Sequence, residues 1–309
     1  MIGKQNEYSF PEMQKKLEKL KECFRKHNSK INIDNNPVFK EYSESLAFFC
    51  QKELLDLGSE QSLKYINNIP AIIKLCSIIH VLDGDCKFNH HIKNHLKELI
   101  KREVNKKDED QTYQNRLFEF SMASRFLENV NSYNVDLSTD CDIIIDKDIA
   151  IECKYVHGEN KLEDNIKKAR RQLYKRIIDD KIAKIGIIAV DLSNLLSGSK
   201  FNRIADINKE FSSKEEMLST FKQYYSKILT NEMENRINKI AINKVFGNSN
   251  KTITTQAILL QSFNFMIINF KDSYIPFTSR ILHPIYNPLL SEEDKSKLKP
   301  IIKSLEVGY

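Results

Sequence analysis

Two apolar runs separated by a short polar turn constrain the fold of this chain more than any other feature of its sequence. The first run covers residues 142–146 (DIIID) and the second covers residues 149–155 (IAIECKY). Two β-branched runs joined by so short a turn are typical of a β-hairpin. We therefore expect two adjacent antiparallel strands here, which bring their side chains close together.

Charged side chains interrupt this hairpin at positions that strand geometry places near one another. Alternate residues of a strand share a face, so Glu152 and Lys154 are expected to point to the same side of the sheet. If residues 146–148 form the turn, the register places Asp142 opposite Glu152, with their Cβ atoms roughly 5 Å apart. The same register places Asp140 opposite Lys154.

Two carboxylates beside an ammonium group suit the cleavage of a phosphodiester bond. Carboxylates hold Mg²⁺ or Mn²⁺, hard cations that prefer oxygen ligands, and a nearby lysine can orient or deprotonate the attacking water. We expect Asp142, Glu152 and the backbone carbonyl of Cys153 to bind the metal, and Lys154 to position the water. The alternative is a cross-strand salt bridge on the open face of a sheet.

The segments on either side of the hairpin alternate between helix and strand. The apolar spacing predicts a helix over residues 112–130, a short strand over 134–137 and a basic helix over 161–178. The continuous apolar run at 185–190 is typical of a strand that is buried on both faces. This alternation indicates an α/β fold.

The first hundred residues have the periodicity of amphipathic helices, whereas later residues alternate between helix and strand. We therefore divide the chain where this pattern changes. We expect an all-helical N-terminal region (1–106), a central domain (107–290) with a helical insertion around residues 202–245, and a C-terminal tail (291–309). The first boundary is placed in the polar run at 105–110.

The sequence pattern in the last part of the central domain predicts strands followed by turns. Residues 253–270 are rich in Ile, Leu, Phe and Thr, and two strands are expected there. Turns and one short terminal helix are expected where four prolines follow: Pro276, Pro284, Pro288 and Pro300.

Composition narrows the class of protein. An apolar fraction of 41% over 309 residues is enough for a packed core, and the net charge of +6 permits a phosphate-binding surface without requiring one. The six cysteines form no CxxC pair, so we expect them to be reduced, in a cytoplasmic protein. The longest apolar stretch, residues 69–82, is too short to span a bilayer, so no membrane partner is expected. With only eight glycines and no Gly-rich loop, P-loop and Rossmann sites are excluded.

The spacing of Asp142, Glu152 and Lys154 resembles the D-x(n)-E-x-K signature of the PD-(D/E)XK nuclease superfamily. The order helix, strand, hairpin, helix, strand over residues 112–191 is similar to its restriction-endonuclease-like αβββαβ core, a mixed central sheet flanked by helices. The resemblance implies a Mg²⁺-dependent endonuclease that cuts DNA, in a restriction or antiviral defence system. The alternative is a catalytically inactive nuclease-like module that binds nucleic acid or protein.

The resemblance also implies two residues on the neighbouring helices. Glu119 matches the acidic residue that many members carry before the core strands, where it is expected to take part in metal binding and catalysis. Its alternative is a solvated helix face. Gln172 matches the glutamine of the RecB-type Q-x-x-x-Y motif, although Arg176 stands where that motif has tyrosine.

The basic helix and the N-terminal region suggest partners. Lys168, Arg171 and Lys175 share one face of the helix, and we expect this face to lie along a phosphate backbone. Its alternative is a solvated face. The N-terminal helices are expected to serve recognition, dimerisation or docking to an accessory protein.

Overall fold

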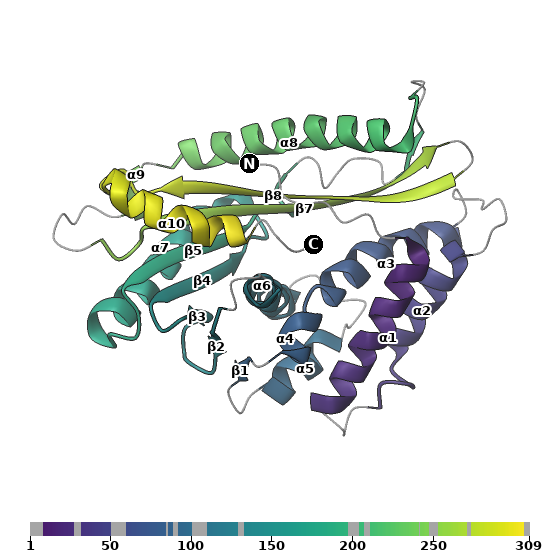
Figure 1. Cartoon of the computed structure of the whole chain (residues 1–309), viewed down its shortest axis with the longest axis horizontal. Coiled ribbons are helices and arrows are strands. Elements are labelled where there is room, and N and C mark those ends of the chain that lie inside the picture. The colour runs from purple at the N-terminus through teal and green to yellow at the C-terminus, as the bar shows by residue number, and fades with distance from the viewer. Residues whose placement is uncertain are drawn as a thin grey trace.

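A mixed β-sheet lies at the centre of the part of the chain that the structure describes (Figure 1). Helices cover both of its faces, so the predicted α/β class is confirmed. The computed structural model describes residues 9–27, 32–50, 60–84, 86–88, 92–100, 110–128, 133–196, 204–206, 211–240, 242–246, 253–270 and 273–305.

Eight strands in these residues form the sheet in the order β1-β2-β3-β4-β5-β7-β6, with β8 paired to β7. The β2–β3, β3–β4 and β7–β8 pairs are antiparallel, whereas β4, β5 and β7 run parallel to one another. The strands are β1 (Lys87–Phe88), β2 (Val135–Leu137), β3 (Ile143–Ile145), β4 (Ile149–Tyr155), β5 (Ile185–Asp191), β6 (Ile204–Asp206), β7 (Ala257–Phe270) and β8 (Ser273–Tyr286).

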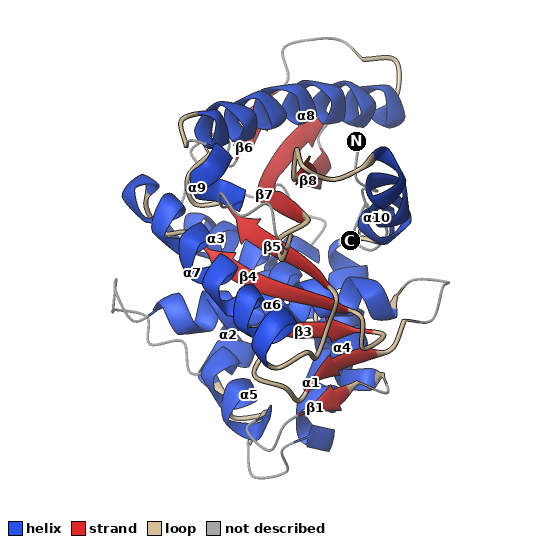
Figure 2. Ribbon diagram, turned by 90° about the vertical axis from the view of Figure 1, so that its left-hand side faces the viewer, coloured by secondary structure: helices blue, strands red, loops and turns tan. Residues whose placement is uncertain are grey.

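The helices lie on both sides of this sheet (Figure 2). A short 3₁₀ helix, Glu159–Lys161, precedes α7, and a π-helical turn, Lys175–Asp179, follows it. The α-helices are α1 (Phe10–His27), α2 (Pro37–Cys50), α3 (Glu60–Cys76), α4 (Ile79–Asp83), α5 (Ile92–Ile100), α6 (Asp110–Leu127), α7 (Leu162–Tyr174), α8 (Lys214–Asn238), α9 (Ile242–Phe246) and α10 (Glu292–Ser304).

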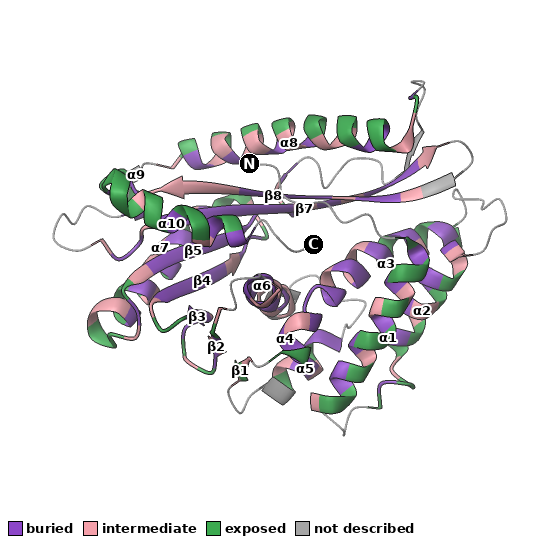
Figure 3. Cartoon of the chain, viewed as in Figure 1, coloured by how far each residue is buried: buried purple, intermediate pink, exposed green. Residues whose placement is uncertain are grey.

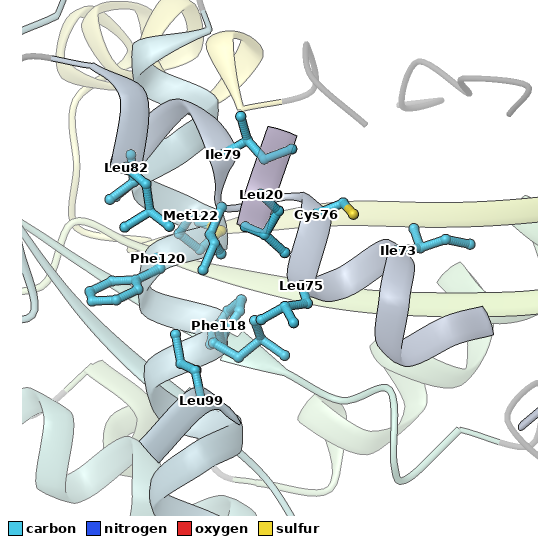
Figure 4. Packing of buried hydrophobic residues seen from close by; sticks show 14 of the residues in the cluster. Leu20, Ile73, Leu75, Cys76, Ile79, Leu82, Leu99, Phe118, Phe120 and Met122 are labelled. Carbon is cyan, nitrogen blue, oxygen red and sulfur yellow. The ribbon is translucent and has the colours of Figure 1, made fainter. Parts of the chain in front are cut away.

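One hydrophobic core lies between the N-terminal helices and one face of the sheet. Ile149, Ile151 and Cys153 of β4 face it, together with Ile187 and Ala189 of β5. Helix α6 is seen nearly end-on in Figure 1, between the strands and α1 to α5, and its described side chains at 113–128 are all buried or half-buried. Figure 4 shows part of this core, with labelled side chains from five helices: Leu20, Ile73, Leu75, Cys76, Ile79, Leu82, Leu99, Phe118, Phe120 and Met122.

A second core covers the opposite face of the sheet. The alternate residues Ala150, Ile188 and Val190 point into it and pack against α7 and α8. Figure 3 shows that β4 and β5 are largely buried, whereas the outer side of α8 is exposed. Because β4 and β5 are covered on both faces, any polar side chain on them has little contact with water unless it lies near a strand end.

The β3–β4 hairpin has the predicted register. Ile145 pairs with Ile149, which leaves the three residues between them as the turn, and pairing ends at Ile143. Asp146 and Lys147 have positive φ angles of 51° and 56° in this turn. Polar residues such as Asp adopt this conformation more readily than β-branched ones, so the turn falls between the two isoleucine runs.

The N-terminal region is not all-helical, contrary to the prediction. Lys87 and Phe88 form β1, which pairs in parallel with β2. A two-residue strand has no periodicity to detect, and its pairing depends on an open edge supplied by a distant segment. The boundary predicted at 105–110 lies outside the described residues.

One helical stretch within the described residues, 60–83, is long and apolar enough to cross a membrane by length and composition. It is longer than the apolar run at 69–82 because polar residues extend the helix toward its N-terminus. Its most apolar window is 67% buried inside the chain, as is typical of a core helix. Ile66, Ile69 and Ile72 of this stretch pack in the first core.

The predicted helical insertion at 202–245 also contains a strand. Residues 204–206 form β6, which pairs in parallel with the second half of β7, and only then does α8 begin. Helix α8 lies along the β7–β8 hairpin (Figures 1 and 2). In the predicted tail, α10 buries Leu298 and Ile302 in the first core.

The prediction of two strands within 253–270, followed by turns, was wrong. Residues 257–270 form one long strand, β7, and the proline-containing segment after it forms β8. Pro276 and Pro284 lie within β8, opposite Ile267 and Leu259. Proline has no N–H to donate, but it is tolerated in a strand that pairs on one side, as β8 does in the described residues.

Candidate active site

Asp142, Glu152 and Lys154 converge near the end of β4, as the hairpin register predicts. The Nζ atom of Lys154 lies 3.4 Å from Oδ2 of Asp142 and 3.4 Å from Oε2 of Glu152. The same nitrogen donates a 3.0 Å hydrogen bond to the carbonyl oxygen of Cys153. Two carboxylates from neighbouring segments therefore share one ammonium group.

The position of Asp142 follows from where β3 begins, because Asp142 directly precedes its first residue. Pairing with β4 stops at Ile143, and Asp142 lies just beyond it. Its Oδ2 accepts a 2.7 Å hydrogen bond from the backbone N–H of Cys153. A side-chain carboxylate therefore takes the place of a strand carbonyl, and this bond holds the carboxylate beside Lys154.

Asp140 does not lie opposite Lys154, contrary to the prediction. Its side chain is exposed, and its carbonyl oxygen accepts a 2.9 Å hydrogen bond from Nη2 of Arg176. The chain turns locally before β3, where the hydroxyl of Thr139 accepts from the N–H of Cys141. A strand register places only the residues that remain in the strand, and Asp140 has left it.

Glu119 points inward from α6, so the alternative of a solvated helix face is wrong. Its side chain is 6% exposed, and Oε2 accepts a 2.6 Å hydrogen bond from Nη1 of Arg116. Burial, and after it repulsion by Asp142, raise the pKa of Glu119 to about 8. One turn earlier, Asn115 accepts a 2.9 Å hydrogen bond from the N–H of Tyr155, which ties α6 to the end of β4.

Glu152 is fully buried, with an exposed fraction of 0%. Burial, and after it repulsion by Asp142, raise the pKa of this carboxyl to about 8, although Lys154 opposes the shift. Burial also works against the charged form of Lys154, but attraction by Asp142 and Glu152 outweighs it and raises the pKa of Lys154. The ammonium group between the carboxylates and the Cys153 N–H bond to Asp142 hold them close together.

Arg116 is a site residue that the sequence interpretation did not include. Burial works against its charge, but attraction by Glu119 and Asp142 outweighs that penalty and raises its pKa. Its side chain is 33% exposed, more than Asp142 or Lys154, so a cation lies at the solvent side of the site. We refer to the following residues as the carboxylate cluster: Asp142, Glu152, Glu119, Lys154 and Arg116.

The oxygen atoms of the carboxylate cluster fit a hard divalent cation. Oε1 of Glu152 is buried and makes no hydrogen bond to any residue that the structure describes. Three carboxylates face only two cationic side chains, and Mg²⁺ binds through one or two carboxylates while keeping several waters. The described residues contain no group of three or more His, Cys, Asp and Glu side chains that would enclose a metal ion. A divalent cation would therefore be held by Asp142, Glu152 and the Cys153 carbonyl, with water as its other ligands.

The π-helical turn after α7 contributes a second residue that was not predicted for the site. Arg176 is buried, and its guanidinium donates a 2.8 Å hydrogen bond to Asp180. Burial works against the charge of Arg176, but the Asp180 bond and attraction by Glu152 outweigh it and raise the pKa of this arginine. Gln172 lies one turn earlier on α7, and its buried Oε1 makes no hydrogen bond to a described residue. Gln172 and Arg176 share a face because they are four residues apart.

The predicted nucleic-acid-binding face of α7 is exposed. Lys168, Arg171 and Lys175 lie on the side of the helix opposite to Ile166 and Leu173, which pack on the sheet. The structure thus brings Asp142, Glu152, Lys154 and Glu119 together, with the carbonyl of Cys153. It leaves the three cationic side chains outside that cluster.

All six cysteines are free thiols, as expected from their spacing. Comparison of the chain with models of protein families, with curated proteins and with solved structures finds no match. The chemistry of the site therefore rests on its own geometry.

Proposed function

We propose that this protein is a divalent-metal-dependent nuclease of the restriction-endonuclease-like PD-(D/E)XK type, which hydrolyses phosphodiester bonds in DNA. The observation that carries the proposal is the convergence of Lys154 with Asp142 and Glu152 near the end of β4. A structural salt bridge needs one anion for one cation. This cluster instead holds excess carboxylates and a buried oxygen without a hydrogen bond to the described residues.

The residues of the cluster divide the work of such a reaction. Asp142 and Glu152, with the carbonyl of Cys153, would hold Mg²⁺ or Mn²⁺. The bound ion would offset charge on the phosphate and make a coordinated water more acidic. Lys154 has three donors and lies between the carboxylates, so it would orient the attacking water and stabilise developing negative charge.

The two residues on α6 complete the site from the other side of β4. Arg116 is exposed enough to meet a phosphate oxygen, and its guanidinium suits this acceptor. Glu119 holds Arg116 through a 2.6 Å hydrogen bond and would bind a metal-coordinated water or a second ion. On α7 and the turn after it, Gln172 and Arg176 would support Glu152 from the second core.

The arrangement of elements supports the family-level proposal. From α6 to β5 the chain forms a helix, three antiparallel strands, a helix and a strand parallel to the third. This is the αβββαβ order that the resemblance implies, with Asp142 directly before its second strand and Glu152 on its third. We further propose a role in restriction or antiviral defence, in which the N-terminal helices contact DNA, a second copy or an accessory protein.

Cleavage assays with matched variants test the proposal. Purified protein is incubated with plasmid, linear duplex, single-stranded DNA and RNA in Mg²⁺, Mn²⁺ or EDTA. Cleavage of DNA in metal and its absence in EDTA are expected. Asp142→Ala and Lys154→Ala are each expected to lower the rate by about 10²–10³-fold or more, because each removes a group that acts in the transition state. Lys297→Ala, in an exposed pair on α10, is the control and should cut normally.

Each other outcome has a clear meaning once circular dichroism shows that the variants fold. Binding to DNA that persists in EDTA without cleavage would support the inactive binding module instead. Cleavage by Lys154→Ala at the rate of the parent protein would reject the site. If the protein neither binds nor cleaves nucleic acid, the charged residues serve as structural ion pairs.

A further inference from the structure

A small cavity lies on the sheet face opposite to Glu152 and Lys154, between that face and the helices α3 and α6. Its volume is about 30 Å³. Ile73 and Phe118, both labelled in Figure 4, belong to the first core and also form part of the cavity wall. The polar side chains around it come from five elements and from the turn after α3: Lys74, Ser77, Gln114, Ser121, Arg125, Asp191, Gln261 and Arg280.

Arg125 is the feature of this cavity that needs explanation. Its side chain is 1% exposed, and Nη2 donates to Oε1 of Gln261. Its Nε and Nη1 are buried and make no hydrogen bond to any residue within the described ranges. A buried guanidinium with unpaired donors is costly, so the packing around it must offer a compensating partner.

The other side chains of the cavity do not balance this charge. Arg280, on β8, is also buried, and Asp191 is the one carboxylate in the described lining. Both oxygens of Asp191 are engaged: Oδ1 accepts from the backbone N–H of Ser193 at 2.8 Å, and Oδ2 accepts from Nε2 of Gln261 at 3.3 Å. Lys74 adds a third cation, 5.3 Å from the centre of the Phe263 ring.

The electrostatics agree with this excess of positive charge. Burial, and after it repulsion by Arg280, lower the pKa of Arg125 well below its usual value, although Asp191 opposes the shift. A guanidinium nevertheless keeps its proton near neutral pH. The unfavourable energy is therefore relieved by an anion rather than by loss of the proton.

We propose that this cavity, which we call the arginine pocket, binds a small oxyanion of the phosphate class. The unpaired Nε and Nη1 of Arg125 lie on different edges of the guanidinium, and each can donate a charge-assisted hydrogen bond to an oxygen of such a group or of a water beside it. The hydroxyls of Ser77 and Ser121 line the same space. A volume of about 30 Å³ compares with the roughly 10–15 Å³ that one water needs, so the pocket admits a phosphate group and not a base or sugar.

The arginine pocket is separate from the carboxylate cluster, and this inference does not depend on the proposed nuclease activity. Tyr155 of β4 pairs with Asp191 of β5, so the two sites meet at the same end of neighbouring strands. Glu152 and Lys154 point to the face opposite to the pocket, whereas Glu119 and Arg116 belong to α6, which also lines the pocket. Phosphate can therefore be tested while the carboxylate cluster is kept free of metal.

The test is a titration of the full chain with inorganic phosphate in EDTA, against chloride at equal ionic strength. Binding is measured by calorimetry and by the midpoint of urea unfolding. The midpoint should rise with phosphate concentration, as expected for a ligand of the folded state. Arg125→Met should weaken phosphate binding by at least about tenfold, since it removes charge-assisted hydrogen bonds. Arg25→Met, at a partly exposed arginine paired with Asp34 on the surface, is the control and should bind like the parent protein.

Two further variants keep the test decisive if Arg125→Met folds poorly. Ser121→Leu leaves both arginines in place and fills the pocket, so it should also abolish phosphate binding. Arg125→Lys keeps the charge but not the planar set of donors, and it should bind phosphate with an intermediate affinity. Absence of a phosphate-specific shift in the parent protein, or equal binding by the parent and Ser121→Leu, would overturn the proposal.

Competition identifies the source of the oxyanion. A short DNA with a 5′-phosphate that displaces inorganic phosphate, while the same DNA with a 5′-hydroxyl does not, assigns the pocket to a nucleic-acid end. If neither DNA displaces it, the pocket is assigned to the free anion.

Discussion

Glu152 and Lys154 of the carboxylate cluster lie at the same end of β4 and β5 as the arginine pocket but on the opposite face of the sheet, and helix α6 contributes side chains to both sites. In the carboxylate cluster, Glu152 is 0% exposed and has a buried oxygen without a partner among the described residues. In the arginine pocket, Arg125 is 1% exposed and has two such nitrogens. The cluster therefore holds more carboxyl groups than cations and the pocket more cations than carboxylates, each in a place where burial makes a charge costly.

The difference between them lies in how the charge is balanced within the protein. Lys154 lies 3.4 Å from each of two carboxylates and offsets part of their repulsion. In the arginine pocket, Asp191 is held by Ser193 and Gln261 rather than by Arg125. Opposite ligands are thus expected at the two sites, a divalent cation at one and an oxyanion at the other.

The largest expected effect is the pH dependence of metal binding. The pKa values of Glu119 and Glu152 are both raised to about 8, so these groups hold protons at neutral pH that a metal must displace. The affinity for Mn²⁺ is expected to rise by up to about tenfold per pH unit and proton released, and to level off above about pH 8. Calorimetry from pH 6 to 9 measures this affinity for Mn²⁺. Sulfate, which keeps its charge, should bind at the arginine pocket with little change over this range, and equal pH dependence at both sites would reject the contrast.

Glu152→Gln is expected to stabilise the metal-free protein, increasingly so as the pH rises. Because the folded pKa of Glu152 lies above its ordinary value of 4.5, the folded state binds more protons than the unfolded state between these two values. The parent protein therefore loses stability over about pH 4.5 to 8, by at most about 1.4 kcal/mol per pH unit from this group, and Gln removes the loss. Urea unfolding at several pH values measures this. A constant difference across the range would contradict the assignment.

Arg125→Met is expected to change stability by a smaller amount that does not depend on pH. In phosphate-free buffer the variant should be as stable as the parent protein or more stable by about 1–3 kcal/mol, because a buried charge without full pairing is removed. Arg25→Met should lose no more than about 1 kcal/mol, as for an exposed pair. A loss of several kcal/mol in Arg125→Met would show that the arginine is balanced within the protein, and the comparison would fail.

The smallest effect is expected on the outer face of α7. Replacing Lys168, Arg171 or Lys175 by Ala should weaken DNA binding a few-fold each and reduce the slope of log affinity against log salt by about 1. These side chains are exposed, so stability should change by no more than about 0.5 kcal/mol. Fluorescence anisotropy with labelled DNA at three salt concentrations tests it. Unchanged affinity would mean that this face is only solvated, and DNA binding would then depend on other cations such as Arg116.

The sequence itself determined the hairpin and the side-chain faces within it. Two isoleucine runs and a three-residue turn leave one register that keeps the apolar residues inside, and this register brings Asp142 near Glu152 and Lys154. The period of the strand is local, so neighbouring residues decide it. Asp140 precedes the first residue of β3, Ile143, and lies outside the strand. The strand register therefore did not predict its position.

Tertiary structure decided the contacts between distant segments. Arg125 and Glu119 both read as charged residues on a helix, and neither periodicity nor spacing shows that α6 is enclosed by the sheet on one side and by the N-terminal helices on the other. Short strands such as β1 and β6 likewise form only because a partner edge is present. Local pattern sets the direction of a side chain along its own element, but what it meets depends on how elements far apart in the chain pack together.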